Sequence, residues 1–220
     1  MFSRKRSVLI IGVGRFGRYL ALKFIELRNE IMIVDKSEDA MADLIPLVTN
    51  AQIGDCTKLE VLHSLGASNF DICFVCIGSN FQTSIEITSQ LKDLGAKYVV
   101  AKADRELHEK FLLRNGADEV IFPEKESANK AAIRLSSQNI MDYIELTPEH
   151  YILEIAPLDR WIGKTIAEVG VRDRYGINIL AIRKDNKVDQ FPSAKHIFME
   201  GEQLIVVMDK PNFYSLLKKK

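Results

Sequence analysis

Three closely spaced glycines, Gly12, Gly14 and Gly17, follow an apolar run at residues 8–11 and open an amphipathic stretch at residues 16–28. The apolar run predicts a buried strand, and apolar residues at helical spacing predict a helix. In such a strand–turn–helix unit the first glycine permits a tight turn and the second lets a pyrophosphate approach the backbone. The third lets helix and strand pack closely. Free N–H groups at the helix N-terminus favour phosphate, so the glycines predict a nucleotide site.

Further apolar runs follow, separated by amphipathic stretches. We expect six strands, each followed by a helix, at residues 8–12, 30–35, 51–53, 71–77, 98–102 and 120–122. Apolar strands that alternate with helices form a parallel sheet covered on both faces. The expected fold is α/β, a Rossmann-like doubly wound parallel sheet. We assign residues 1–140 to this nucleotide-binding domain, with its last helix at residues 128–136.

The sequence changes character after residue 140. Strands are expected at residues 151–156, 177–183 and 203–208, together with a helical turn at 165–169 and a terminal helix after Pro211. We assign residues 141–220 to a small α+β domain. A domain of this size rarely stands alone, so we expect it to pair with a second copy.

An acidic residue, Asp35, ends the second expected strand about 20 residues after the glycines, as the dinucleotide fingerprint requires. Its carboxylate would accept hydrogen bonds from ribose hydroxyls and repel a 2′-phosphate. We therefore expect the site to take adenosine nucleotides or NAD and to reject NADP. The alternative is a solvated aspartate at a strand end.

Polar residues also follow the later strands, on the sheet edge where open α/β folds bind ligands. Asp55, Cys56 and Thr57 would lie beside the adenine, and Gly78-Ser79-Asn80 follows the fourth strand. Lys102 ends the fifth strand and is expected to reach a phosphate, with an ordinary surface lysine as the alternative.

Catalytic residues are not evident. A dehydrogenase needs a substrate domain with an acid/base group, commonly histidine, and His196 in the small domain has no evident carboxylate partner. The histidines at positions 63, 108, 150 and 196 are scattered and are expected to be surface or packing residues. Cys73 and Cys76 would point to opposite faces of one strand, which favours core cysteines over metal or redox chemistry. We expect no enzymatic activity.

Charge and hydropathy restrict the partners. Lysine plus arginine and aspartate plus glutamate both number 30, so nothing suggests nucleic acid. No run approaches the roughly 20 apolar residues of a membrane helix. We expect a cytoplasmic protein whose membrane role, if any, comes through a partner.

Four motifs resemble one known family. They are Gly-Val-Gly-Arg-Phe-Gly at 12–17, Gly-Asp-Cys-Thr at 54–57, Phe-Pro-Glu-Lys-Glu at 122–126, and Val-Arg-Asp-Arg-Tyr-Gly-Ile-Asn-Ile-Leu-Ala-Ile at 171–182. The first three look like the RCK (regulator of potassium conductance) domain of Ktr and Trk gating subunits. The last looks like its RCK-C half. The resemblance covers nearly the whole chain, with both halves in order, and is closest to the Ktr branch.

The resemblance implies a gating subunit of a potassium uptake system. Homodimers would assemble into an octameric ring on the cytoplasmic side of a membrane potassium-translocating subunit of Ktr or Trk type. ATP and ADP would compete for the Rossmann site, with NAD or NADH as an alternative ligand. The alternatives in function are an NAD(H)-binding oxidoreductase and a free-standing nucleotide or redox sensor.

The resemblance also implies roles for single residues. Arg15 would lie near the terminal phosphate, and Glu124 would place Mg²⁺ or Na⁺ beside the γ-phosphate. The predicted nucleotide-binding residues are Gly12, Gly14, Arg15, Phe16, Gly17, Asp35, Lys36, Asp55, Cys56, Thr57, Gly78, Asn80, Lys102 and Glu124.

Some relatives in this family bind cyclic di-AMP in the RCK-C half. Arg172, Ile177, Asn178 and Pro192 occupy comparable positions here. An arginine can pair with phosphate, and aliphatic side chains can pack on adenine. The alternative is that Ile177 is strand core and Arg172 a charge at the rim.

Overall fold

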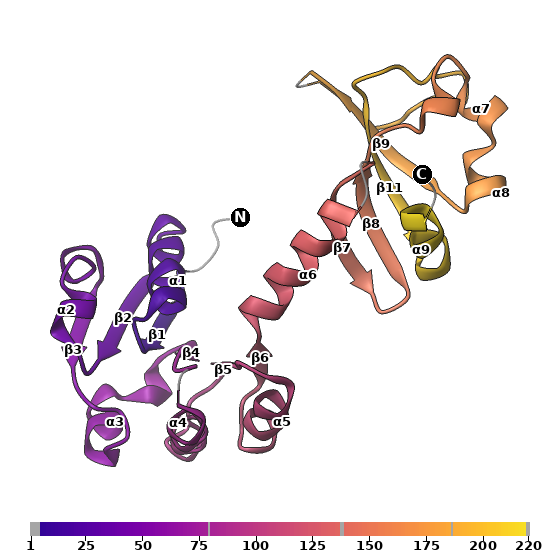
Figure 1. Ribbon diagram of the computed structural model, residues 1–220. Coiled ribbons are helices and arrows are strands. Elements are labelled where there is room, and N and C mark those ends of the chain that lie inside the picture. The colour runs from indigo at the N-terminus through magenta and orange to yellow at the C-terminus, as the bar shows by residue number, and fades with distance from the viewer. Residues whose placement is uncertain (1–4, 79, 137–138, 186, 219–220) are drawn as a thin grey trace. The chain divides into compact units, whose positions relative to one another are not determined.

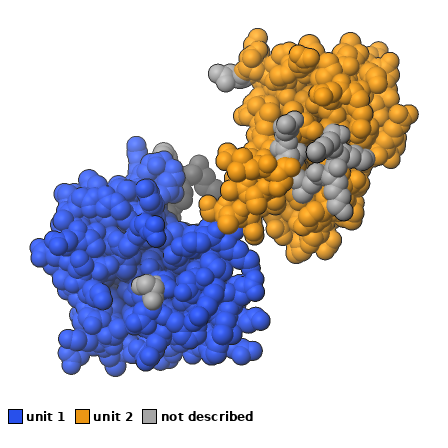
Figure 2. All heavy atoms as spheres, viewed as in Figure 1, with its two compact units in different colours: residues 1–125 blue, residues 126–220 orange. Residues whose placement is uncertain are grey.

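The computed structural model describes residues 5–78, 80–136, 139–185 and 187–218, so Ser79 lies outside the described residues. The chain forms two compact units, Met1–Lys125 (unit 1) and Glu126–Lys220 (unit 2), shown in Figure 2. The division falls inside helix α6 (Pro123–Ser136), whereas the sequence analysis placed the domain boundary near residue 140. Most of α6 groups with unit 2 because Ile133 packs against the core of that unit and Lys130 pairs with Asp142.

Unit 1 is built on a parallel six-stranded sheet, which confirms the expected fold. The order is β3-β2-β1-β4-β5-β6. The strands are β1 (Ser7–Ile11), β2 (Glu30–Asp35), β3 (Asn50–Ile53), β4 (Ile72–Val75), β5 (Val99–Lys102) and β6 (Glu119–Ile121). The helices are α1 (Arg15–Glu26), α2 (Glu38–Met41), α3 (Leu59–Leu65), α4 (Phe81–Asp93) and α5 (Glu106–Arg114). Single 3-10 turns lie at Ile45–Leu47 and Ala67–Asn69.

Two hydrophobic cores lie on the two faces of this sheet. Helices α3, α4 and α5 pack on the face that carries Cys73, and α1 and α2 pack on the face that carries Cys76; Figure 1 shows the two sets of helices on either side of the sheet. The two thiols therefore point to opposite faces, as expected. Burial raises the pKa of both to about 12, so neither is a ready thiolate at neutral pH.

The face of the sheet that carries Cys76 is only partly covered by helices. Beyond α1, a groove of about 920 Å³ runs over β4, β5 and β6. Its lining is mainly apolar and comprises Phe16, Leu20, Ile72, Phe74, Tyr98, Val100 and Ile121, with Arg6, Asp71 and Glu119 at its polar positions. We call this surface the open sheet face.

Unit 2 contains an antiparallel five-stranded sheet, which confirms a small second α+β domain. The order is β10-β9-β11-β8-β7. The strands are β7 (Ile140–Thr147), β8 (His150–Ile155), β9 (Asn178–Lys184), β10 (Lys187–Asp189) and β11 (Gln203–Asp209). The helices are α6, α7 (Ile166–Val169), α8 (Val171–Tyr175) and α9 (Lys210–Lys218), with a 3-10 turn at Asp159–Trp161. Trp161, Phe198 and Phe213 are fully buried in its core.

Several elements differ from expectation. The sequence analysis did not anticipate β7, β10 or α8. Strand β7 is an edge strand interrupted by two register shifts, so its apolar residues do not alternate cleanly. Helix α6 begins at Pro123 rather than at residue 128. Proline is favoured in the first turn of a helix, but the polar segment after it shows no apolar periodicity. No helix in the described parts of the chain is long and apolar enough to cross a membrane.

Candidate nucleotide-binding site

A cleft of about 430 Å³ lies at the carboxyl ends of the central strands of unit 1. Four chain segments form it: the glycine turn after β1, the end of β2, the loop after β3, and the loop after β4 with the first turns of α4. The lining residues are Ile11, Gly12, Gly14, Val34, Asp35, Lys36, Gly54, Asp55, Cys56, Thr57, Cys76, Ile77, Gly78, Asn80, Thr83 and Ile87. This is the edge at which parallel α/β sheets bind ligands.

Each of the three glycines meets a distinct geometric need. Gly12 has φ +92°, a conformation that favours glycine, and a Cβ there would lie 3.1 Å from Ile77. Gly14 faces open space, which leaves its backbone accessible from the cleft. A Cβ on Gly17 would lie 2.1 Å from the carbonyl oxygen of Gly12, so α1 could not pack so closely on β1. The turn at Gly12 and the close packing at Gly17 are as expected, and the approach of a phosphate to Gly14 stays a prediction.

Asp35 is fixed by the backbone around it. Its Oδ2 accepts a hydrogen bond of 2.7 Å from Val13 N–H, and its Oδ1 accepts one of 2.9 Å from Ser37 N–H. A carboxylate oxygen can accept more than one hydrogen bond, so a ribose hydroxyl can still donate to Asp35. The carboxylate thus faces the cleft in a set orientation.

The loop after β3 forms the wall next to Asp35, whose carbonyl oxygen accepts a hydrogen bond of 2.9 Å from Gly54 N–H. The hydroxyl and the N–H of Thr57 donate to Asp55 Oδ1 at 2.8 and 3.0 Å, and these bonds lower the pKa of Asp55. Between them Cys56 is 5% exposed, and burial raises the pKa of its thiol to about 12. Cys56 is therefore a packing residue of the cleft wall and not a nucleophile.

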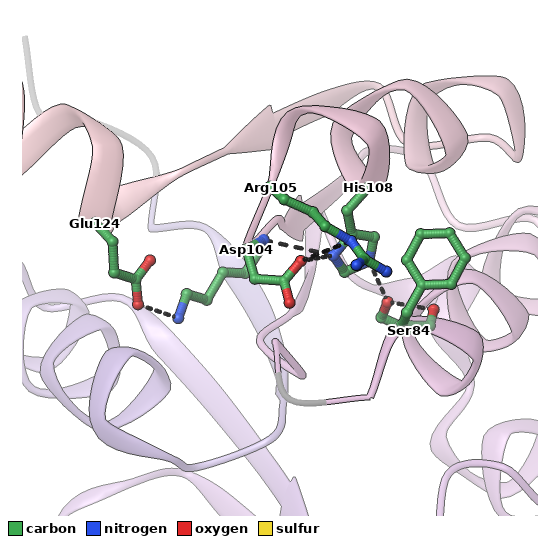
Figure 3. A network of polar contacts seen from close by, with 7 residues as sticks. Ser84, Asp104, Arg105, His108 and Glu124 are labelled. Atoms are coloured by element: carbon green, nitrogen blue, oxygen red, sulfur yellow. Dashed lines mark hydrogen bonds and ion pairs between the residues drawn. The ribbon is translucent and has the colours of Figure 1, made fainter.

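Lys102 and Glu124 pair with each other beside the cleft. Lys102 Nζ lies 2.6 Å from Glu124 Oε1 (Figure 3), and this contact lowers the pKa of the Glu124 carboxyl. The Lys102 side chain is only 14% exposed, whereas that of Glu124 is 60% exposed. Lys102 Nζ also lies 3.3 Å from where a Cβ on Gly78 would stand. The ammonium therefore reaches the loop after β4, as a phosphate-binding lysine must.

The predicted residues fall into three groups. Gly12, Gly14, Asp35, Lys36, Asp55, Cys56, Thr57, Gly78 and Asn80 line the cleft. Three predicted residues lie outside the lining of the cleft: Arg15, Lys102 and Glu124. Lys102 and Glu124 form the pair beside Gly78. The positive charge of Arg15 also contributes to lowering the pKa of Glu124. The side chain of Phe16 packs with the core on the other face and lines the open sheet face, so only its backbone belongs to the phosphate turn. Gly17 serves packing.

Thr83 and Ile87 of α4 were missed, because their helical spacing marks them only as one face of a helix. A further network was also missed: His108 is fully buried and contacts Ser84 and Asp104. The spacing of Asp104 and His108, four apart at a helix start, was the one available signal.

A metal ion at this site would need coordinating oxygen atoms from the nucleotide as well as from the protein. The described residues hold no group of three or more His, Cys, Asp or Glu side chains that could bind a metal ion. Mg²⁺ in nucleotide sites is commonly held by one or two carboxylates and phosphate oxygens. Glu124 fits such a site only as a single protein ligand, with the phosphates supplying most of the coordination.

In unit 2, Arg172 lies exposed on α8, and Ile177 and Asn178 lie between α8 and the start of β9. Pro192 comes from the loop after β10. Ile177 is 1% exposed and belongs to the core, which favours its packing role.

One expectation about unit 2 is wrong: His196 has a carboxylate partner, because its Nε2 lies 3.2 Å from Oε2 of the buried Glu202.

Most of the chain is similar to known proteins. Residues 8–123 match the TrkA-N domain and residues 150–219 the TrkA-C domain. The chain is 38% identical to the Ktr system potassium uptake protein C of Bacillus subtilis over 92% of each chain. It is 33% identical to the Ktr system potassium uptake protein A of the same organism, over 94% of this chain and 93% of that protein.

A solved structure of the GsuK channel shares the fold, with a TM-score of 0.69 at 19% identity over 98% of this chain. The chain spans 39% of the length of that channel chain. Structures of GsuK bound to NAD and bound to ADP match with TM-scores of 0.64 and 0.52.

Proposed function

The chain belongs to the family of the Ktr system potassium uptake proteins, with a TrkA-N and a TrkA-C domain, and from this we propose that it is a nucleotide-sensing regulatory subunit of a potassium transporter. The observation that carries the proposal is the cleft of unit 1. Its glycine turn offers backbone N–H groups to phosphates, and its fixed Asp35 carboxylate faces the same space. The family's members are named for potassium uptake, which confirms the expectation that the chain is not an enzyme.

The ligand we propose is ATP, in competition with ADP. The cleft has an apolar floor for adenine in Ile11, Val34 and Ile77. Arg15 begins α1 directly after the phosphate turn, where a guanidinium can neutralise the added charge of a triphosphate. NAD or NADH is the competing ligand, since NAD and ADP each occur in structures of GsuK, which has the same fold.

A cation completes the proposed ATP site. The γ-phosphate and the Glu124 carboxylate would repel each other unless Mg²⁺ or Na⁺ stood between them. Because Lys102 holds Glu124 in this structure, the ammonium would have to move toward phosphate as Glu124 moves toward the cation. Only a ligand with enough negative charge can drive that exchange.

Unit 2 carries the second proposed ligand, cyclic di-AMP. The support is that Arg172 is exposed on α8 and that Asn178, six residues further on, is exposed at the start of β9. Titration of the full chain with cyclic di-AMP tests this, and an Arg172→Ala variant that binds as well as the wild type would remove the site.

We further propose that the protein acts as a homodimer, the unit of a larger ring. Exposed Ala128, Ala132 and Leu135 recur along α6 at i, i+4 and i+7 and form an apolar stripe. The open sheet face lies beside β6, where a doubly wound sheet requires a covering helix. A second copy of α6 supplies a helix with such an apolar stripe.

A membrane potassium-translocating subunit is the proposed partner, and the proposed location is the cytoplasmic face of the membrane. Calorimetric titration with ATP, ADP and NADH, side by side, tests the sensing role. Co-purification with a membrane potassium transporter subunit tests the partnership. A chain that binds none of the three nucleotides would contradict the proposal, and tight NADH binding without ATP binding would favour a redox sensor.

A further inference from the structure

Three polar side chains from two helices and a turn meet beneath the loop that follows β4. Ser84 lies on α4, His108 on α5, and Asp104 in the turn between β5 and α5. Ser84 Oγ lies 2.6 Å from His108 Nε2, and His108 Nδ1 lies 2.9 Å from Asp104 Oδ1 (Figure 3). Ser84 and His108 are fully buried, whereas the Asp104 side chain is 45% exposed. Both ring nitrogens of His108 therefore have a partner.

The order serine, histidine, aspartate is that of a hydrolase triad, but this geometry does not suit catalysis. The Ser84 hydroxyl is inaccessible to a substrate and also donates to the carbonyl oxygen of Phe81 at 3.0 Å. A nucleophile must reach the reacting atom. The network therefore has a different role.

The Ser84 end of the network controls the first turn of α4. Ser84 N–H donates to Asn80 O at 3.1 Å, and the Asn80 side chain accepts from Thr83 N–H at 3.1 Å. Asn80 and Thr83 both line the nucleotide cleft. A contact that holds Ser84 thus also holds two residues of the cleft wall.

The Asp104 end controls the turn after β5. Asp104 stands two residues beyond Lys102, the lysine that pairs with Glu124 beside Gly78. Its neighbour Arg105 places its guanidinium 5.1 Å from the centre of the Phe81 ring, and that ring lies 4.9 Å from the His108 ring. The stack of Arg105, Phe81 and His108 joins the same two loops a second time.

We propose that His108 is a positioning residue for the nucleotide: it sets the α4 wall of the cleft against the lysine that reaches the phosphates. The proposal rests on the proposed nucleotide-binding function. A buried polar group is costly when it loses its partner, so the network has one low-energy arrangement. That arrangement fixes Asn80 and Thr83 relative to Lys102 before the ligand arrives, and preorganisation of this kind raises affinity.

The test uses the full chain with His108→Phe, which keeps the ring and removes both hydrogen bonds. The matched control is Leu112→Ala, a fully buried core residue one turn further along α5. Each is titrated with ATP and ADP by calorimetry, well below its melting temperature. We expect His108→Phe to bind about tenfold more weakly, because the α4 wall loses its fixed position, and Leu112→Ala to bind like the wild type.

Two further variants keep the test decisive. Ser84→Ala removes one hydroxyl and is expected to weaken binding as His108→Phe does, with no added loss in the double variant. His108→Gln, whose amide can reach Ser84, is expected to recover part of the affinity. If the wild type binds nucleotide and Ser84→Ala binds equally well, His108 only stabilises the fold and the inference is overturned. If the wild type binds neither nucleotide, the proposed function falls as well.

Discussion

Oδ2 of Asp35 accepts a hydrogen bond of 2.7 Å from Val13 N–H, so the residue expected to bind ribose also holds the glycine turn expected to bind the phosphates. One carboxylate would thereby link the ribose and phosphate parts of the proposed site. The loss of this carboxylate should weaken both, which gives the substitution of Asp35 a larger expected effect than the loss of a ribose contact alone.

The Asp35→Ala variant is expected to bind ATP and ADP at least about tenfold more weakly, because a hydrogen bond to a charged group is worth about 1.5–3 kcal/mol. Calorimetry measures the loss, with Asp39→Ala, an exposed aspartate on α2, as the control. The same carboxylate should make NADP a much weaker ligand than NAD for the wild type. Unchanged ATP affinity in Asp35→Ala would remove this residue from the site.

Replacement of Arg15 by alanine is expected to lower ATP affinity and leave ADP affinity within about threefold, under 1 kcal/mol. The physical reason is that the guanidinium would meet charge that only the γ-phosphate supplies. Arg18→Ala on the same helix is the control, because Arg18 already pairs with Asp43. Equal losses for ATP and ADP would contradict a role in reading the γ-phosphate.

For Glu124→Gln we expect ATP affinity to fall and to depend less on Mg²⁺ or Na⁺, because the carboxylate that is the proposed protein ligand for the cation is gone. Titrations of ATP with and without the cation measure this. The control is Glu106→Gln, which also breaks a lysine–glutamate pair, the contact of 3.0 Å with Lys125, away from the cleft residues. A cation effect of wild-type size in Glu124→Gln would place the metal elsewhere.

The pair of Lys102 and Glu124 predicts a pH effect. Lys102 lowers the pKa of Glu124, so the stabilisation is present above the ordinary glutamate pKa and disappears as the pH falls through the lowered one. In Lys102→Met the Glu124 pKa should rise toward its ordinary value, and the pH-dependent loss of stability attributable to this group should shrink. NMR titration of the side-chain carboxyl carbon reads the pKa directly. If the pKa of Glu124 is the same in Lys102→Met as in the wild type, the pair does not persist in solution.

The apolar stripe on α6 predicts a substitution that separates the proposed dimer. Leu135 is 77% exposed within one chain, so Leu135→Lys should leave the fold intact and raise the dimer dissociation constant by about tenfold or more. Asn129→Lys, on the same helix and outside the stripe, is the control. Sedimentation velocity distinguishes the species. Identical association of the two variants would assign the dimer contact to another surface.

Local patterns carried most of what could be predicted. The glycine turn and Asp35 could be predicted because each role depends on its own strand end and on a fixed spacing along the chain. The six parallel strands could be predicted because their apolar runs are short and bounded by helices. In contrast, strand β7 was missed because its register shifts disturb the alternation that marks a strand.

Contacts between distant segments could not be predicted. The Lys102–Glu124 pair joins a strand end to a helix start, and Ser84 meets His108 across two helices. In each of these two pairs, the sequence around one residue does not indicate which residue is its partner. The same holds for His196 and Glu202, although they are close in sequence: Glu202 Oε2 accepts a hydrogen bond of 3.0 Å from Met199 N–H in the intervening loop and lies 3.2 Å from His196 Nε2.

The burial of all three cysteines has a practical consequence. Cys56, Cys73 and Cys76 are at most 8% exposed, and burial raises the pKa of each to about 12. Thiol-reactive dyes and spin labels are electrophiles that thiolates attack, so the native cysteines should react slowly with maleimides and need not be removed before labelling. Two cysteines, one introduced on an exposed residue of each unit, would then carry the only fast-reacting thiols. The distance between their labels, measured with and without nucleotide, would report directly on whether the two units move relative to each other.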